Sequence, residues 1–230
     1  MKKHVVVSGT QETVNKAGRK SEVAYQTAKR MKELKLDLEK AMIGIAAIGN
    51  ARVAGDDSTA REMASIETYL TSNVSVGSTG AVATGDGTDA MTAGTDRDLT
   101  EALLTTVLQS AYTNGGDPKL LFVSPTNKGV VSGFDGGGTH YVDKDDKKLV
   151  NSVDVYVGDF HTLSVKPSRQ LVGDNVLAID PQYVALATLR GAKMTDLAKT
   201  GDSIRKELVM EGTLEVCNEA AHAMICDTNG

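Results

Sequence analysis

The chain has few of the residues that mark small secreted or metal-stabilised domains. Its 230 residues include no Trp, two Cys and four Pro, and the aromatic content is only 4%. Cys217 and Cys226 lack the CxxC spacing of a zinc site, so we expect two buried, reduced thiols in a cytosolic setting. A disulfide between them is the alternative if they lie on paired strands. A chain of this length can bury a core without covalent supports.

Long apolar runs are also missing. No stretch approaches the roughly 18 apolar residues that a membrane-spanning helix needs, and the Val run at 5–7 is too short for a secretory signal. The net charge of −5 argues against a dedicated nucleic-acid-binding protein, which needs clustered Lys and Arg. The basic segment 16–40 is interleaved with acids, and we interpret it as a solvated helix face in preference to a nucleic-acid patch. Neither a membrane nor a specific nucleic-acid sequence is therefore expected as a partner.

Three loops have the composition of ligand-binding loops but not the required spacing. The glycine-rich segments 85–88 and 133–138 match neither G-x-x-x-x-G-K-[ST] nor a G-x-G-x-x-G turn between a strand and a helix. Asp143, Asp145 and Asp146 faintly resemble a calcium loop, but the central Gly and terminal Glu of an EF-hand are missing. The sequence therefore predicts no cofactor-binding and no metal-binding residues.

Nucleophilic catalysis has one weak candidate. Ser124 follows an apolar run, and His140 or His161 together with Asp159 could supply a base and an orienting group, but no G-x-S-x-G is present. Any chain of this size offers such trios by chance. We expect no catalytic residues and no enzyme activity, and an α+β hydrolase is the least favoured alternative.

The most strongly patterned stretch is a long amphipathic helix, predicted over 19–49. Small or apolar side chains recur in steps of three and four, which places them on one helix face. They are Val23, Thr27, Met31, Leu34, Leu38, Ala41 or Met42, and Ile45. At 1.5 Å per residue the helix would be about 45 Å long, so a sheet or a partner should lie along it. Gly49 and Asn50 tolerate the left-handed conformation in which helices commonly end.

The remaining pattern predicts an α+β fold. Further helices are predicted at 60–70, 98–114 with Asp98 as its N-cap, and 126–134 after Pro125. Strands are predicted at 4–8, 119–124, 149–157, 162–166, 175–179, 183–189, 203–215 and 220–226, the last pairing with the one before it. Segment 191–200 is interpreted as a connector. Segment 71–98 is rich in Gly, Ser, Thr, Ala and Asp and is predicted to be flexible or extended, as an arm laid against a neighbour.

Several short runs, taken in order, resemble one protein family. They are VVVSGTQETVNKAGRKSEVAY at 5–25, LTEALL at 99–104 with GGDP at 115–118, SGF at 132–134, YVD at 141–143, VDVY at 153–156 with DF at 159–160, LAKTGD at 197–202, GTLE at 212–215 and NEAA at 218–221. The first looks like the entry to a long helix, and the last three look like closing strands. The ordered set is similar to the major capsid proteins of tailed bacteriophages over nearly the whole chain.

This resemblance implies the tailed-phage major capsid fold, called the HK-ninety-seven type. In that fold a long spine helix packs on a narrow sheet in a peripheral domain, and an α/β axial domain lies at the capsomer centre. Carried onto this chain, 1–98 is the peripheral domain with the spine helix at 19–49, and 99–190 is the axial domain. Segment 191–230 supplies return strands of the peripheral domain, which pair with 4–8.

The function implied is a shell subunit. It would assemble with itself into hexamers and pentamers around phage double-stranded DNA, in the bacterial host cytoplasm, with portal and decoration proteins as further partners. An encapsulin-like compartment with protein cargo is the alternative on the same fold. Family members usually carry an N-terminal arm and an extended loop ahead of the stretch that starts at Met1, so both are expected to be absent here.

Overall fold

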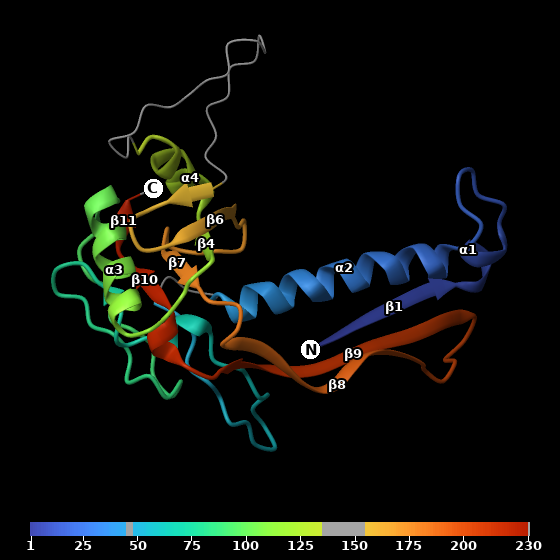
Figure 1. Cartoon of the computed structure of the whole chain (residues 1–230). Coiled ribbons are helices and arrows are strands. Elements are labelled where there is room, and N and C mark those ends of the chain that lie inside the picture. Colours follow the sequence, from blue (N-terminus) through green and yellow to red (C-terminus); the bar gives the residue numbers. More distant parts are fainter. Residues whose placement is uncertain (45–47, 135–154, 230) are drawn as a thin grey trace, which may run out of the picture. The chain divides into compact units, whose positions relative to one another are not determined.

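A computed structural model describes residues 1–44, 48–134 and 155–229, which fold into two compact units (Figure 1). Unit 1 comprises Met1–Lys40 and Leu186–Thr213, and unit 2 comprises Ala41–Ala185 and Leu214–Gly230. Each unit contains helices and strands, which confirms the predicted α+β class. The aspartates at 143–146, His140 and the first part of the strand predicted at 149–157 lie outside the described residues.

Unit 1 is built on a three-stranded sheet with β9 (Ser203–Val216) at its centre. The first strand, β1 (Lys2–Ser8), runs antiparallel to β9, with Val5 opposite Lys206. This confirms both the strand at the start of the chain and its C-terminal partner. On the other side of β9 lies β8 (Val184–Asp196), which continues through the segment predicted as a connector. A bidentate ion pair between Arg190 of β8 and Glu211 of β9, with N–O distances of 2.7 and 2.5 Å, joins this part of β8 to β9.

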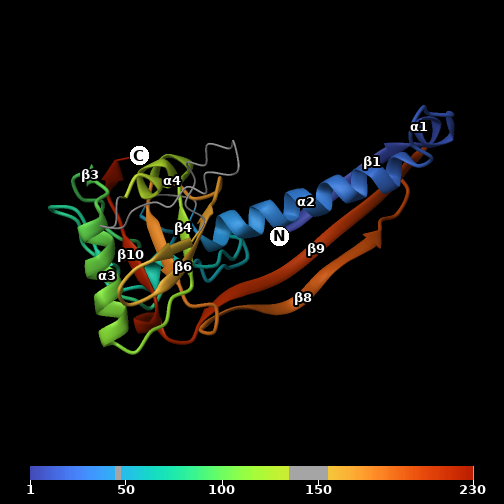
Figure 2. The same cartoon turned by 45° about the horizontal axis from the view of Figure 1, so that its top comes forward.

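The long helix α2 (Glu22–Met42) lies along β1 and β9 in unit 1 (Figures 1 and 2). The face predicted from periodicity is the face that packs on the sheet, and Leu34 at its centre is 1% exposed. Two polar contacts flank this packing. The Lys3 ammonium lies 2.6 Å from the Asp37 carboxylate, and the Thr27 hydroxyl donates to the Met194 sulfur at 3.8 Å.

The helix is shorter at both ends than the predicted 19–49. At its start the Ser21 hydroxyl accepts a hydrogen bond from the third following amide. The Glu12 carboxylate, from α1 (Gly9–Thr13), accepts hydrogen bonds from the amides of Glu22 and Val23 at 2.9 and 3.2 Å. At the other end Gly44 has φ 88°, a left-handed conformation that stops an α-helix. The helix ends at Met42, so the predicted stop at Gly49 came about two turns too late.

Unit 2 contains a mixed six-stranded sheet in the order β2-β10-β7-β4-β6-β5. Its strands are β2 (Val74–Ser75), β4 (Leu120–Val123), β5 (Val155–Val157), β6 (Thr162–Pro167), β7 (Val176–Ile179) and β10 (Ala223–Ile225). The β4 and β6 strands are parallel, and β7 runs antiparallel to β4 and to β10. The prediction that 220–226 pairs with 203–215 was wrong. The all-apolar β10 is buried between β7 and β2, because both of its faces need an apolar environment.

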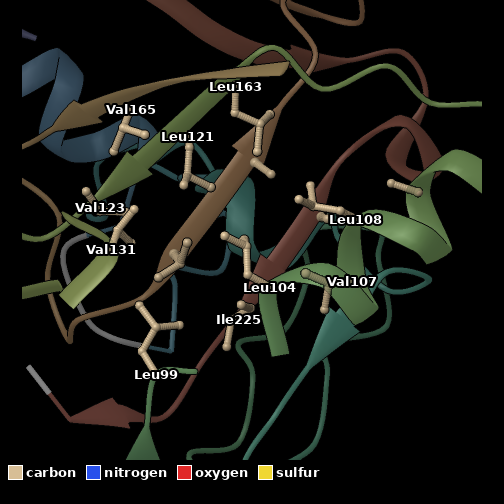
Figure 3. Close-up of a cluster of buried hydrophobic side chains, with 14 residues drawn as sticks. Leu99, Leu104, Val107, Leu108, Leu121, Val123, Val131, Leu163, Val165 and Ile225 are labelled. Atoms are coloured by element: carbon tan, nitrogen blue, oxygen red, sulfur yellow. The ribbon is translucent and has the colours of Figure 1, made fainter. Parts of the chain in front are cut away.

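Two apolar clusters cover the opposite faces of this sheet. Side chains alternate along β7, so that Val176 and Ala178 belong to one cluster and Leu177 and Ile179 to the other. The first cluster includes α3 (Glu101–Thr113) and α4 (Pro125–Ser132), and Figure 3 shows the leucines of α3 directed at those of β4 and β6. This sheet is therefore the main core of the chain.

The helices of unit 2 begin at polar caps. The prediction of Pro125 at the first position of α4 is confirmed. The cap is Ser124, whose hydroxyl accepts a hydrogen bond from the Asn127 amide at 3.1 Å. For α3, the predicted N-cap Asp98 is wrong. Thr100 is the cap, because Asp98 belongs to β3 (Arg97–Asp98), which pairs with β11 (Thr228–Asn229). The predicted helix at 60–70 is reduced to the 3-10 turn η1 (Ile66–Thr68).

Segment 71–98 is packed into unit 2, so the prediction that it is flexible was wrong. Its apolar residues Ala83 and Met91 are buried in the second cluster. The Asp227 carboxylate holds the two ends of the loop together by accepting hydrogen bonds from the amides of Gly77 and Gly94, at 2.8 and 2.9 Å. A Cβ at Gly94 would lie 2.7 Å from that carboxylate, so a larger residue does not fit there.

Asn73 fastens the start of the same loop. Its amide nitrogen donates to the carbonyls of Ala220 and His222 at 2.7 and 2.8 Å. Its amide oxygen accepts from Ser110 and Asn114 near the end of α3, both at 2.7 Å. The side chain is 3% exposed and fully satisfied, which is the condition under which a buried amide stabilises a fold.

Glu67 is a buried acid whose pKa is affected by no cation of the described residues. The residue is 1% exposed, and burial raises the pKa of its carboxyl to about 7, opposed by the Ser65 hydroxyl and a backbone amide. Neither carboxyl oxygen makes a hydrogen bond of normal geometry among the described residues. Glu67 is therefore a titratable weak point in the core of unit 2.

The packing of α2 predicts a contrast between two leucines on the same helix. Leu34→Ala should lower the free energy of unfolding by about 2–5 kcal/mol, because it leaves a cavity between α2 and the sheet. Leu36 is 49% exposed, so Leu36→Ala should change that free energy by less than about 0.5 kcal/mol. Urea unfolding followed by circular dichroism measures both, and equal losses would contradict this packing.

Glu67 predicts a pH dependence of stability. Its pKa is higher in the folded chain than the ordinary value of 4.5, so the folded state holds its proton longer than the unfolded state. Stability should therefore fall as pH rises from about 4.5 to 7, by about 3 kcal/mol from this group. Glu67→Gln should remove that part of the loss.

Urea unfolding at several pH values checks this, with Glu62→Gln at an exposed acid as the control. An unchanged pH profile in Glu67→Gln would show that the carboxyl is not held neutral by burial.

Candidate functional site

The residues considered for nucleophilic catalysis do not come together. Since β4 and β6 are parallel with Leu120 opposite Ser164, Ser124 follows one end of this pair and His161 precedes the other end. The Ser124 hydroxyl is occupied as the cap of α4. The His161 ring is buried, with Nδ1 3.5 Å from the Asp117 carboxylate. His140 lies outside the described residues. The geometry that a hydrolase requires is therefore not formed by Ser124 and His161.

In the glycine loop at 85–88 the hydrogen-bond donors bind the carboxylate of Asp86, a residue of the loop itself. Asp86 accepts hydrogen bonds from the Thr88 amide at 2.8 Å and from the hydroxyls of Thr84 and Thr88. These contacts, the Thr88 hydroxyl first, hold the pKa of Asp86 below its usual value. A negative charge at this position opposes phosphate binding, so the loop is a tight turn. The second glycine segment, 133–138, lies mostly outside the described residues.

The thiols and the metal candidates show no organised site in the described part of the chain. Both thiols are free, so the disulfide alternative does not hold. Cys226 is buried as predicted, but Cys217 is exposed, so that part of the prediction was wrong. Burial raises the pKa of the Cys226 thiol far above its usual range, which keeps it unreactive. Among the described residues no three His, Cys, Asp or Glu side chains are placed to bind a metal ion. None of the helices described is long and apolar enough to cross a membrane.

The apolar core of unit 1 is small for its extent. Every residue of this unit is described, and its buried apolar side chains are Val5, Val7, Leu34 and Leu208. By the register of β1 and β9, Val5, Val7 and Leu208 lie on the sheet face that meets α2. Two strands of 13 and 14 residues and a 21-residue helix thus share one thin apolar layer. Such an element gains little stability by itself, which is typical of a part that is completed by neighbouring molecules.

The other face of the sheet is uncovered in the subunit. By the same register Val6 and Arg205 are opposite one another on this face, as are His4 and Glu207. Val6 is 60% exposed, and Glu207 lies about 4 Å from both Lys2 and His4. We call the residues of β1 and β9 that point away from α2 the open sheet face. In β1 they begin at Lys2, and in β9 they end at Glu211. It combines exposed apolar area with charges of both signs, the composition of a contact surface between proteins.

The sequence contains a signal for the open sheet face, but catalytic and ligand-binding motifs do not reveal it. A strand with one buried face alternates apolar and polar residues. The run Val5-Val6-Val7 does not alternate, so an apolar side chain is placed on both faces of β1. Arg205 and Glu207, which lie on the same face as Val6, come from β9, almost 200 residues later, and only the strand register reveals them.

Comparisons with known proteins agree with a shell subunit. The model of the family described as "SU10 major capsid protein" matches residues 1–229. The chain is similar in structure to the cyanophage A-1(L) capsid asymmetric unit, with a TM-score of 0.68 and 13% identity over 100% of this chain and 77% of that one. The holo-SrpI encapsulin of Synechococcus elongatus PCC 7942 gives 0.62 and 10%, covering 100% and 73%. The satellite phage P4 procapsid gives 0.58 and 13%, covering 100% and 70%.

No curated protein sequence matches the chain. At identities of 10–13% the solved structures establish the fold alone, and they confirm the tailed-phage capsid fold predicted from the sequence. The family match covers nearly all of the chain and goes further. The chain belongs to the SU10 major capsid protein family: it is a structural subunit that assembles with itself into the shell of a virion, and it is not an enzyme.

Proposed function

We propose that this major capsid protein assembles into hexamers and pentamers that close into an icosahedral shell around phage double-stranded DNA. Assembly takes place in the cytoplasm of a bacterial host, and portal and decoration proteins join the same shell. Two features of unit 1 support the proposal: its apolar core is small, and its open sheet face is exposed. A neighbouring subunit could bury the open sheet face and thereby stabilise the unit. Many modest contacts of this kind add up through multivalency.

The two compact units suggest how the chain divides into the domains of the capsid fold. We assign unit 1, with α2 on its narrow sheet, to the peripheral domain, and unit 2, with the six-stranded sheet, to the axial domain. The predicted division into 1–98, 99–190 and 191–230 places the boundaries elsewhere and stays a prediction. In this assignment the open sheet face contacts the peripheral domain of a neighbouring copy.

An encapsulin-like shell is the second candidate, because the SrpI encapsulin shares the fold with a TM-score of 0.62. The contents of purified particles separate the two proposals. A virion shell should contain nuclease-protected double-stranded DNA, whereas a compartment of the encapsulin kind should contain a second protein and little nucleic acid.

The open sheet face predicts which substitution stops assembly. The purified chain should form closed shells or capsomer rings in negative-stain microscopy. Val6→Glu should lower the assembled fraction at least tenfold, because each contact would then have to bury a carboxylate in place of an apolar side chain. A tenfold change in an association constant corresponds to only about 1.4 kcal/mol. The subunit should still fold, since Val6 is 60% exposed and does not support the core.

The matched control is Val14→Glu, at an equally exposed valine outside the sheet, which should assemble normally. A wild-type chain that stays monomeric at high concentration would contradict the proposed function. Normal assembly of Val6→Glu would remove the open sheet face from the contact.

A further inference from the structure

The two units carry opposite net charge, which the overall value of −5 conceals. Unit 1 has 15 Lys and Arg against nine Asp and Glu, a formal charge of +6. The rest of the chain, unit 2, therefore carries −11. An argument from the charge of the whole chain does not apply to unit 1, whose surface is that of a basic protein.

The helix α2 separates charges that alternate in the sequence. Three of its acids are engaged at the sides of the helix. Glu22 lies 2.8 Å from Arg19, Glu33 lies 2.6 Å from Arg30, and Asp37 lies 2.6 Å from Lys3. These ion pairs neutralise the three acids, and one of them engages Arg30, the arginine of the helix. The lysines are left on the side away from the sheet.

Steps of three and four along that side run through Tyr25, Lys29, Lys32, Leu36 and Lys40, all of them exposed. We call this stripe, together with the adjacent Lys35, the lysine face. Lys29 stacks on the Tyr25 ring at 4.7 Å. Lys32, Lys35 and Lys40 form no ion pair with any acid that the structure describes. Glu39 is the one acid beside them, so the face has a net charge of about +3.

The dimensions of the lysine face suit a polyanion. From Lys29 to Lys40 the helix rises about 16 Å. Duplex DNA presents one phosphate charge about every 1.7 Å of its axis, so each lysine has several phosphates within reach. Lys side chains are compact charges on flexible stems, which hold phosphate without fixing its orientation.

A protein partner fits this face less well. Lysine is depleted in the buried centre of protein interfaces, and the apolar side chains here are only Tyr25 and Leu36. The open sheet face of the same unit has the mixed charges and apolar area that a protein contact favours, as described above.

We propose that the lysine face of α2 binds the phosphate backbone of nucleic acid, without regard to sequence. This inference rests on the proposed function, in which the shell encloses DNA. It implies that the lysine face of α2 lies on the inner surface of that shell. The helix is a suitable support, because its opposite face is fixed on the sheet through Leu34.

The test is the salt dependence of DNA binding by the full-length chain. Fluorescence anisotropy with a labelled 20-base-pair duplex measures the association constant between 50 and 200 mM salt. For four lysines the slope of log K against log salt concentration should be about −3.6. Lys29→Gln, Lys32→Gln and Lys40→Gln combined should make the slope shallower by about 2.7, with at least a tenfold loss of affinity at 50 mM salt.

Gln has a helix propensity close to that of Lys, so the triple variant should remain folded. If it does not fold, Lys32→Gln alone should change the slope by about 0.9. Lys193→Gln combined with Lys199→Gln is the matched control, because both lysines are exposed in unit 1 but belong to the β8–β9 hairpin. This control should bind DNA as the wild type does, and two duplexes of different sequence should bind equally.

Wild-type binding that does not depend on salt, or a triple variant with unchanged slope, would overturn the inference. Microscopy of the same preparations separates this result from the proposed function. If the triple variant folds but no longer assembles, the lysine face lies between subunits and the inference fails while the shell function stands. If the wild type binds DNA through the lysine face but never assembles, the shell function fails and the surface assignment stands.

Discussion

The packing of one face of α2 on the narrow sheet of β1, β9 and β8 is the constraint on which unit 1 depends. Leu34 lies at its centre, with Val5, Val7 and Leu208 on the sheet. Burial of four apolar side chains contributes on the order of 6–12 kcal/mol, a small gain against the conformational entropy of ordering such long elements. The ion pairs and the Glu12 cap at the helix start add to this layer without thickening it. A subunit that gains stability from its neighbours is well suited to a shell.

Unit 2 solves a different problem. Its sheet is apolar on both faces, and polar side chains fasten its long loops to that core. Asn73 and Asp227 each join segments that lie more than 100 residues apart in the chain. Because these residues satisfy backbone groups that would otherwise be buried without partners, a loop poor in apolar residues can still be ordered. Unit 2 therefore buries its apolar clusters within the single chain, and Glu67 is the pH-sensitive exception among its buried residues.

The fold could be predicted where local physics decides it. The period of α2, the buried strand before Ser124 and the cap of α4 are written in consecutive residues. The sequence failed where a distant residue decides. Glu12 sets the start of α2 from another element, and the partners of β10 come from segments far away in the chain. The composition of 71–98 suggested mobility, because nothing in this segment shows that the Asp227 carboxylate closes the loop from 133 residues beyond Gly94.

The candidate site followed the same rule. The ordered motifs of the sequence led to the capsid family, and with it to the expectation of a structural protein. It did not reveal the open sheet face or the lysine face, because each exists only after side chains that alternate in the sequence are sorted by strand register or helix rotation. Val6 is set apart from Val5 and Val7 by the pleat, and Lys32 from Glu33 by one helical step.

The central claim is that unit 1 is completed by neighbouring subunits, whereas unit 2 is complete in the single chain. Amide hydrogen exchange, compared between dispersed subunits and assembled particles, tests it most directly. The account predicts that assembly increases protection in β1, β9 and α2, and leaves the amides of β4, β7 and β10 unchanged. Equal protection of unit 1 in both states would contradict it.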